Sequence, residues 1–256
     1  MQRRRACGGG RRYPFAVSTS HPSTVPPALL SLRGSSRLSS VVYDQIKERL
    51  LEGRYSGGER LSVEALRKEW GISKQPVMEA LRRLSGDGLV DIIPQVGCQV
   101  TTYSPREVED FFVMFGGFEG TISGIAALRR TDAQLAELDR SSEKIGRLCE
   151  AIDPVERSHG YRVLNRRFHT TIHAMAHSRV MAETSARMWD LSDFLINTTG
   201  RQQPLSSALE QRHDDHERIR AALHAGDHQA ARREMEQHIV EIVGSVIHFE
   251  QQRSES

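Results

Sequence analysis

The stretch SKQPVMEALRRLSGDGLVDIIPQVGCQV, residues 73–100, decides the fold that we expect for this chain. Ser73 is a suitable N-cap for a helix, and Gly86 and Gly88 end that helix. Its apolar side chains recur at the spacing of one helix face, at Val77, Ala80, Leu81 and Leu84. A second face is predicted to point outward, with side chains four residues apart at Lys74, Met78 and Arg82.

The residues on either side complete a recognisable unit. Residues 89–93 and 98–102 are short strand-forming runs joined through Pro94 and Gly97, which predicts a hairpin. Upstream, residues 42–50 have helical spacing, and Ser62 can cap a helix over 63–70. The helix after Ser73 then completes a helix-turn-helix motif. A basic helix followed by a hairpin is typical of a winged DNA-binding domain.

The composition limits the class of protein. With 256 residues, of which 38% are hydrophobic, the chain is long enough for two domains with a core each. The formal charge of +2 is too small to indicate a nucleic-acid partner, so any basic surface must be local. Cys7, Cys98 and Cys149 are scattered and form no CxxC pair, which is typical of a reducing compartment.

Residues 1–40 are rich in arginine, proline, glycine and serine and contain no acidic residue. Because this composition cannot form a packed core, we expect a disordered basic tail that adds weak attraction to phosphates. An organelle transit peptide is the alternative, although proline and glycine interrupt its helix. No stretch is expected to reach the apolar length of a secretory signal or a membrane span, so secretion and membrane insertion are not predicted.

From Ser104 onward the strand pattern is replaced by helical spacing. The predicted helices lie at 106–130, 132–151, 154–175, 179–198, 205–225 and 228–251. Gly226 and Asp227 form a helix end followed by a helix cap, so the last two helices should be antiparallel neighbours. The predicted fold is mainly α: a tail over 1–40, a winged helix-turn-helix domain over 41–103, an all-helical bundle over 104–251 and a short tail over 252–256.

These features together resemble the GntR family of bacterial transcription regulators, in particular the FadR subfamily, whose C-terminal half is the helical FCD ligand-binding domain. The resemblance covers residues 41–249. At the DNA-binding end it depends on residues 42–51 and 61–70, and on Pro76, Val77, Glu79, Ala80, Leu81, Gly88, Leu89 and Gly97. It implies that the C-terminal domain binds an effector and forms a homodimer.

The resemblance also implies how DNA is bound. The winged domain would place the helix over 74–83 in the major groove and the hairpin over 93–98 against the backbone or the minor groove. The expected DNA-binding residues are Lys74, Gln75, Met78, Arg82, Arg83 and Gly97. The family usually has arginines where this chain has Lys74 and Met78, so the operator sequence does not follow. The alternative is that Arg82 and Arg83 only solvate an exposed helix face.

Two segments place histidines where a metal could use them. Asn165 and His169 are four residues apart, so they project from one helix face. His216 and His238 lie on the last two helices, which antiparallel packing would bring together. The alternative is a set of partly buried, hydrogen-bonded histidines, or simply exposed ones.

This pattern is similar to the FCD metal site, which is matched by Asn165, Phe168, His169, His216, Gly226, Asp227, Ala230 and His238. The resemblance implies a divalent metal held by Asn165, His169, His216 and His238. Zinc is the expected metal, with nickel or manganese as alternatives. Many family members have aspartate where this chain has Asn165, and a neutral amide oxygen is a weaker ligand.

The resemblance further implies a small carboxylate effector beside the metal, contacted by His173 and Glu119. An arginine that is common in the first FCD helix falls near Gly116 here, so the effector is expected to be atypical. Four further C-terminal histidines are expected to be exposed to solvent: His177, His213, His224 and His228.

The resulting hypothesis is a homodimeric bacterial repressor, cytoplasmic and associated with the nucleoid, whose binding to double-stranded operator DNA responds to the effector. A metal-dependent enzyme is disfavoured because no general base, nucleophile elbow, phosphate loop or dinucleotide fingerprint accompanies the histidines. An architectural DNA binder without an effector is the remaining alternative.

Overall fold

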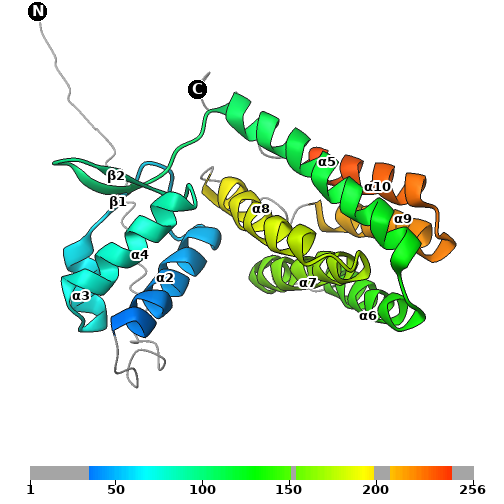
Figure 1. Ribbon diagram of the computed structural model, residues 1–256, viewed down its shortest axis with the longest axis horizontal. Helices are drawn as coiled ribbons and strands as arrows, with labels where there is room; N and C mark the ends of the chain where they lie inside the picture. Colours follow the sequence, from blue (N-terminus) through cyan, green and yellow to red (C-terminus); the bar gives the residue numbers. More distant parts are fainter. Residues whose placement is uncertain (1–34, 151–153, 199–207, 244–256) are drawn as a thin grey trace, which may run out of the picture.

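The computed structural model describes residues 35–150, 154–198 and 208–243. Figure 1 shows two lobes: the winged unit with α2, α3, α4 and the strands, and a bundle that contains α5 to α10. The predicted fold class, a mainly α chain with a winged helix-turn-helix followed by a helical domain, is confirmed.

The N-terminal lobe consists of three helices and a small antiparallel sheet. The helices are α2 (Ser35–Leu51), α3 (Val63–Trp70) and α4 (Lys74–Gly86), and the strands are β1 (Arg60–Leu61), β2 (Val90–Ile93) and β3 (Gly97–Val100). The strand order is β1-β3-β2, and β2 pairs with β3 from Val90 opposite Val100 to Ile93 opposite Gly97. Gln95 in the hairpin turn has a φ of 63°, a left-handed conformation that few residues other than glycine adopt.

Cap chemistry explains both ends of α3. The backbone amide of Ala65 donates to the Ser62 hydroxyl at 3.1 Å, so Ser62 caps α3 as predicted. Gly71 ends α3 in the left-handed conformation, at a φ of 64°, which allows the sharp turn into α4. Ser73 does occupy the N-cap position of α4, but its side chain makes no capping hydrogen bond.

Two boundaries differ from the prediction. Helix α2 begins at Ser35 rather than near residue 41, so the last residues assigned to the tail belong to the first helix, where Ser39 is buried. Residues 60 and 61 were not predicted as a strand, but they form β1, which pairs with β3. Both differences depend on packing and pairing with distant residues. The rest of the predicted tail, residues 1–34, lies outside the described part of the chain.

The C-terminal lobe is helical throughout its described residues. It contains α5 (Pro105–Arg129), α6 (Asp132–Cys149), α7 (Pro154–Met175), α8 (Arg179–Thr198), α9 (Leu209–Ala225) and α10 (His228–Val240). Ser104 with Glu107 forms a complete capping box for α5, and Gly226 with Asp227 separates α9 from α10 as predicted. Residues 205–207 and 244–251, which were predicted to extend α9 and α10, lie outside the described residues.

Helices α5 and α10 approach closely because a line of glycines on α5 faces α10. A Cβ atom built on Gly116, Gly120 or Gly124 would lie 2.9–3.0 Å from a backbone carbonyl oxygen of α10. Each successive glycine meets the next turn of α10, at Glu236, Arg232 and His228 respectively. The absence of side chains along this line therefore sets the distance between the two backbones.

The expectation that no segment reaches the apolar length of a membrane span is wrong for α5. This helix contains an 18-residue window with a mean hydropathy of 1.5, and 61% of that window is buried inside the structure. Its apolar character is explained by packing, because Phe112, Phe115 and Ile122 have no exposed surface. A core helix of a globular domain has the same composition.

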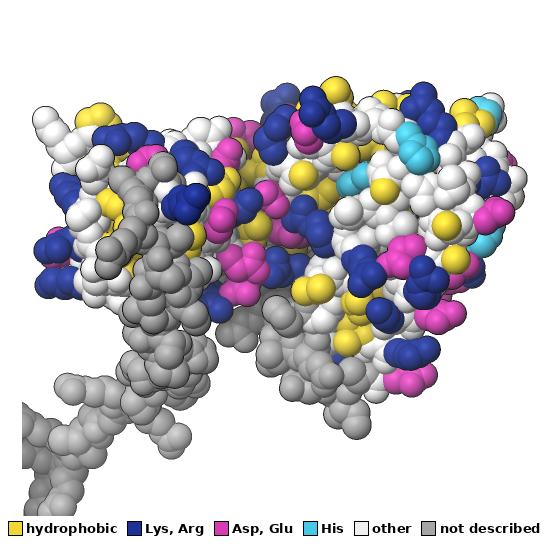
Figure 2. Space-filling model, turned by 60° about the horizontal axis from the view of Figure 1, so that its bottom comes forward, with side chains coloured by type: hydrophobic (Ala, Val, Ile, Leu, Met, Phe, Trp, Pro, Cys, Tyr) yellow, Lys and Arg dark blue, Asp and Glu magenta, His cyan; other side chains and the backbone are white. Residues whose placement is uncertain are grey.

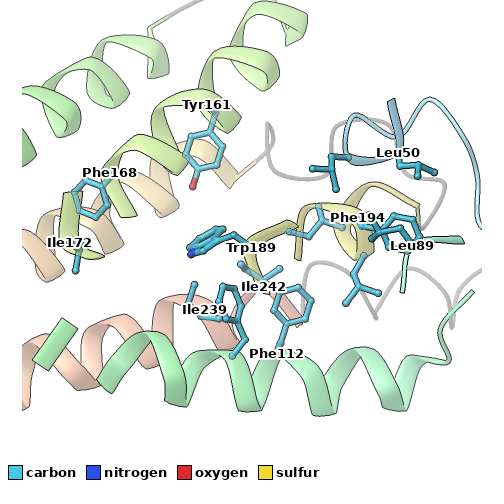
Figure 3. Close-up of a cluster of buried hydrophobic side chains, with 14 of the residues drawn as sticks. Leu50, Leu89, Phe112, Tyr161, Phe168, Ile172, Trp189, Phe194, Ile239 and Ile242 are labelled. Atoms are coloured by element: carbon cyan, nitrogen blue, oxygen red, sulfur yellow. The ribbon is translucent and has the colours of Figure 1, made fainter. Parts of the chain in front are cut away.

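The two lobes share a continuous hydrophobic core. Leu50 of α2, Leu89 before β2 and Phe194 of α8 lie together at the junction, and the cluster continues toward Phe112 and Trp189 (Figure 3). The connection between β3 and α5 is also held in place, because the Tyr103 hydroxyl donates to the Gly88 carbonyl at 2.8 Å.

Polar contacts join the lobes around this core. Figure 2 shows basic and acidic side chains facing one another where the lobes meet. The Asn197 side-chain amide donates to the Leu51 carbonyl at 2.7 Å, Lys47 pairs with Asp190 at 3.0 Å, and Arg162 pairs with Glu48. Helix α2 is thus attached to α7 and α8.

We expect Gly120→Ala to destabilise the protein. The new methyl group would lie 2.9 Å from the Arg232 carbonyl oxygen, so α10 must move, which costs about 1–3 kcal/mol and exceeds the gain in helix propensity. Gly117→Ala is the matched control, because no heavy atom lies within 4 Å of its added Cβ and alanine stabilises a helix by up to about 1 kcal/mol. Urea unfolding of both variants measures the difference, and equal stabilities would contradict the packing described here.

Candidate functional site

The outer face of α4 presents the polar side chains that the sequence predicted for DNA contact. Lys74, Gln75 and Arg82 are exposed. Within the described residues, Arg82 makes no hydrogen bond or ion pair, so its guanidinium is available to a ligand. Met78 is only partly exposed and packs against the core, in contrast to Arg82 four residues later.

Arg83 has a different environment from Arg82. Its guanidinium stacks over the Tyr43 ring of α2, 4.0 Å from the ring centroid, and Nη1 donates to the Ser40 hydroxyl at 3.3 Å. The Tyr43 hydroxyl donates to Asp87 at 2.7 Å, and burial together with this carboxylate raises the pKa of the phenol. Arg83 therefore helps to hold α4 against α2. This packing role cannot be seen from helical spacing alone.

The hairpin forms an exposed wing beside α4. Gly97 starts β3 with a φ of 118°, and neighbouring Val96 is 47% exposed. No heavy atom lies within 4 Å of a Cβ added to Gly97, so its backbone is open to an approaching molecule. The wing and α4 together present a surface of the kind that enters DNA grooves.

Three histidines from three helices meet in the centre of the C-terminal bundle. His169 of α7, His216 of α9 and His238 of α10 each offer one ring nitrogen, and these nitrogens lie within 4.8 Å of one another. All three are buried, and Asn165, one helical turn before His169, is buried as well. The structure thus brings together the three histidines that the sequence grouped in a metal site.

Several polar atoms of this cluster have no hydrogen-bond partner in the described structure. They are the side-chain oxygen of Asn165 and both ring nitrogens of His169 and of His216. Burying such atoms without a partner costs about 1–3 kcal/mol each. A divalent metal would satisfy the amide oxygen and one nitrogen of each ring, because neutral imidazole nitrogens and an amide oxygen are ligands for zinc and similar ions. The donor set therefore fits a metal.

Asp215 orients one of these histidines and was not identified from the sequence. Nδ1 of His238 lies 3.1 Å from a carboxylate oxygen of Asp215, so Nδ1 carries the proton and Nε2 keeps its lone pair. Burial opposes ionisation of Asp215, but His238, Arg212 and Arg218 outweigh it and lower the pKa of this carboxyl. The only sequence signal was an acidic residue directly before His216.

The surroundings keep the three imidazoles neutral. Burial is the main cause that lowers the pKa of His169, His216 and His238. Neighbouring basic groups add to it, and at His238 the contact with Asp215 opposes it in part. Aromatic rings form the walls: Phe168 lies 4.3 Å from His216 and Trp189 lies 4.3 Å from His169, measured between ring centroids. A neutral imidazole is the form that binds a metal.

A second polar group lies one helical turn beyond His169 and contains both residues predicted to contact an effector. Nε2 of His173 is 2.8 Å from a Glu119 carboxylate oxygen, and the Ser185 hydroxyl donates to the other oxygen at 2.5 Å. Ser185, which the sequence did not single out, is also 3.1 Å from the same His173 nitrogen. In a nucleophilic triad the serine and the acid contact opposite ring nitrogens, so this arrangement does not activate the serine.

Two other positions were tested by the structure. Gly116, where the family arginine was expected, faces α10, and an added Cβ would lie 2.9 Å from a Val240 methyl group. No side chain fits at this position without moving α10. Of the histidines predicted to be exposed, His177, His224 and His228 are exposed, but the prediction for His213 is wrong because it is half-buried against Gly146.

The chain combines a winged DNA-binding domain with a helical domain that contains a buried cluster of histidines. This combination is typical of a DNA-binding transcription regulator. The sequence matches the family described as "Bacterial regulatory proteins, gntR family" over residues 38–100 and the FCD domain over residues 110–241. The chain therefore belongs to the GntR family of bacterial transcription regulators and carries an FCD domain.

Similar proteins agree with this assignment. The chain is 28% identical over 200 residues to the HTH-type transcriptional repressor GlaR of Escherichia coli K12, which covers 77% of this chain and 90% of GlaR. It is 25% identical over 230 residues to the repressor RspR of the same organism, covering 88% of this chain and 95% of RspR. These relatives are transcription regulators rather than enzymes, as predicted.

Solved structures share the fold. E. coli McbR/YncC superposes with a TM-score of 0.69 at 22% identity, over 84% of this chain and 98% of that chain. A GntR regulator from Rhodococcus sp. RHA1 gives a TM-score of 0.65 at 16% identity, over 82% and 97% of the two chains.

We expect the stability of the metal-free protein to fall as the pH drops below about 6.5, the ordinary pKa of histidine. Below this pH the histidines of the unfolded chain become protonated, whereas the three buried histidines of the folded protein stay neutral. Each buried histidine therefore lowers the free energy of unfolding by about 1.4 kcal/mol per pH unit, until the pH reaches its lowered pKa in the folded state. Above this range their contribution is fully present. Urea unfolding in EDTA at pH 7.5 and 5.5 measures the slope.

His216→Gln should reduce this slope, whereas His228→Gln should not, because His228 is exposed on α10. An identical slope in the wild type and in His216→Gln would show that His216 does not remain neutral on folding.

Proposed function

We propose that this chain is an effector-responsive repressor of the FadR subfamily, which acts as a homodimer on double-stranded operator DNA in the bacterial cytoplasm. The observation that supports it most is the group of buried, unpartnered nitrogens at His169 and His216, inside the FCD domain of a DNA-binding protein. Such atoms are expected where a ligand or metal completes the core. GlaR and RspR are described as repressors, which favours repression for this chain.

The metal would be held by His169, His216 and His238, with Asn165 as an oxygen ligand. Zinc is our first choice, because imidazole nitrogens and an oxygen are suitable ligands for it, and nickel or manganese are the alternatives. When bound, the metal would supply a positive charge that attracts the carboxylate of the effector. Asp215 would fix the ring of His238 for this role.

The effector would be a small organic acid in contact with the Glu119, His173 and Ser185 group. Helix α5 offers no cation at Gly116, so the carboxylate would depend on the metal. The buried Glu119 carboxylate would instead accept hydrogen bonds, which favours an effector with a hydroxyl or amino group in addition to its carboxylate.

Effector binding would change DNA affinity by favouring one arrangement of the two winged domains in the dimer. A ligand shifts such an equilibrium only by its difference in affinity for the two states. The contacts of α2 with α7 and α8 support this coupling, because α7 carries both Asn165 and His169. A two-fold symmetric dimer requires an operator with matching half-sites.

Metal analysis of the purified protein, followed by a thermal-shift screen of small hydroxy and amino acids, tests this proposal. Bound metal and a stabilising acid that also alters operator affinity would support it. An architectural DNA binder would contain no metal at this site and would bind DNA equally with and without these acids.

We expect Arg82→Ala to weaken specific DNA binding by about 1–3 kcal/mol and to relax base preference at one position of the half-site. Arg106→Ala removes an equal charge from an exposed position on α5, outside the winged domain, and serves as the control. Electrophoretic mobility shifts on a fragment with the promoter of the chain's own gene measure both. Equal affinities for Arg82→Ala and wild type would place the recognition surface elsewhere.

We expect Asp215→Asn to lower zinc affinity by about 10- to 100-fold, because the charged carboxylate that fixes the tautomer of His238 and makes its ring more basic is replaced by a neutral amide. Asp214→Asn, at the exposed neighbouring residue, should leave the affinity unchanged. Competition with a chromogenic chelator measures zinc binding, and circular dichroism verifies folding. A folded Asp215→Asn protein with wild-type affinity would contradict the role of Asp215.

A further inference from the structure

A cavity lies between the two lobes. It has a volume of about 300 Å³ and is lined by α2, by the end of α4 with Leu89, and by α5 and α8. This volume is at the lower end of the range for small-molecule sites, which often lie at domain interfaces.

The cavity is separate from the histidine cluster because it uses another face of α8. Thr184, Arg187, Met188 and Leu191 of α8 line the cavity. The α8 residues near the histidines are the buried Ser185 and Trp189, and Ser185 contacts the effector group described above. One helix therefore lies between the two sites.

Most of the charged groups around the cavity are already paired. Lys47 forms an ion pair with Asp190 at 3.0 Å, and Asp87 accepts a hydrogen bond from Tyr43 at 2.7 Å. Arg187 is the exception: it is exposed and makes no hydrogen bond or ion pair to any residue that the structure describes. Its guanidinium is free to form charge-assisted hydrogen bonds with an anion.

The rest of the lining is largely apolar. Its apolar wall is formed by Leu89, by Phe111 and Met114 of α5, and by Met188 and Leu191 of α8. Met114 is 59% exposed, although a side chain of its size is usually buried. Methionine side chains are flexible and adapt to ligands of different shape, particularly aromatic ones.

We propose that this interdomain cavity is a second ligand site, which binds an amphipathic organic anion with its apolar body against Phe111, Met114 and Leu191 and its anionic group on Arg187. The ligand contacts both lobes, so it binds most tightly when the winged domain is docked on α8. It stabilises that arrangement independently of any metal or effector at the histidines.

Isothermal titration of the full chain with 2-naphthoate and with 2-naphthol at pH 7 tests the proposal. The two probes share an aromatic body, and only 2-naphthoate is charged. We expect 2-naphthoate to bind at least about 10-fold more tightly, since a hydrogen bond to a charged group contributes about 1.5–3 kcal/mol.

Variants locate the site. Arg187→Gln should reduce 2-naphthoate affinity to that of 2-naphthol and leave 2-naphthol binding unchanged. Arg179→Gln, at an exposed arginine on the same helix, is the control and should bind as the wild type does. Leu191→Trp should block both probes by filling the cavity.

The histidine cluster gives an independent control. His216→Gln should bind 2-naphthoate like the wild type, because the cavity does not include this residue. The proposal is overturned if Arg187→Gln binds 2-naphthoate with wild-type affinity, if only His216→Gln loses binding, or if the wild type shows no saturable binding up to about 1 mM. The last result leaves the proposed function at the histidine site untouched, so the two can fail separately.

Discussion

The C-terminal domain depends on one physical constraint: imidazole nitrogens placed in an apolar core require a partner. His169 and His216 are enclosed by Phe168 and Trp189, and burial holds their pKa values well below the ordinary value. Protonation therefore cannot satisfy them, and no protein group in the described structure does. On our proposal a metal ion satisfies one nitrogen of each ring, and it then joins α7, α9 and α10 at one point. The same ion would remove the free-energy cost of burying these ring nitrogens without partners, and it would also form a binding site for a ligand.

Ion pairs where the two lobes meet connect the histidine-containing core to the winged domain. Asp190 of α8 contacts Arg166 at 3.2 Å and Lys47 at 3.0 Å, and Arg166 follows Asn165 directly in the sequence. On the other side, Tyr43 lies one helical turn before Lys47 and contacts Arg83 of α4. A shift of α7 on ligand binding would thus reach α4 through contacts between α8 and α2. Contiguity of this kind makes coupling physically reasonable, while its size is a matter for measurement.

The sequence predicted what depends on local chemistry. Helical spacing located α5 to α9 to within a few residues. Ser62 marked the start of α3, and Gly226 with Asp227 marked the break between α9 and α10, because caps require particular side chains. The histidine grouping followed from family resemblance, since spacing alone cannot place α7 against α9 and α10. What the sequence missed depends on tertiary contacts: Asp215 beside His238, Ser185 beside Glu119, Arg83 on Tyr43, and β1 paired with β3.

The short connection between the lobes has a consequence for how such regulators diversify. Residues 101–104 join β3 to the capped start of α5, and Tyr103 is tied to Gly88 on one side and lies edge-on to Phe194 on the other. Residues 101–104 are therefore not a flexible linker, and the winged domain cannot simply be replaced by that of another regulator. A chimera that keeps this FCD domain but receives a foreign winged domain would also need matching residues for Leu50, Lys47 and Glu48. Recombination between the two domains therefore gives a well-packed protein only when the winged domain and the surface of α7 and α8 come from the same parent.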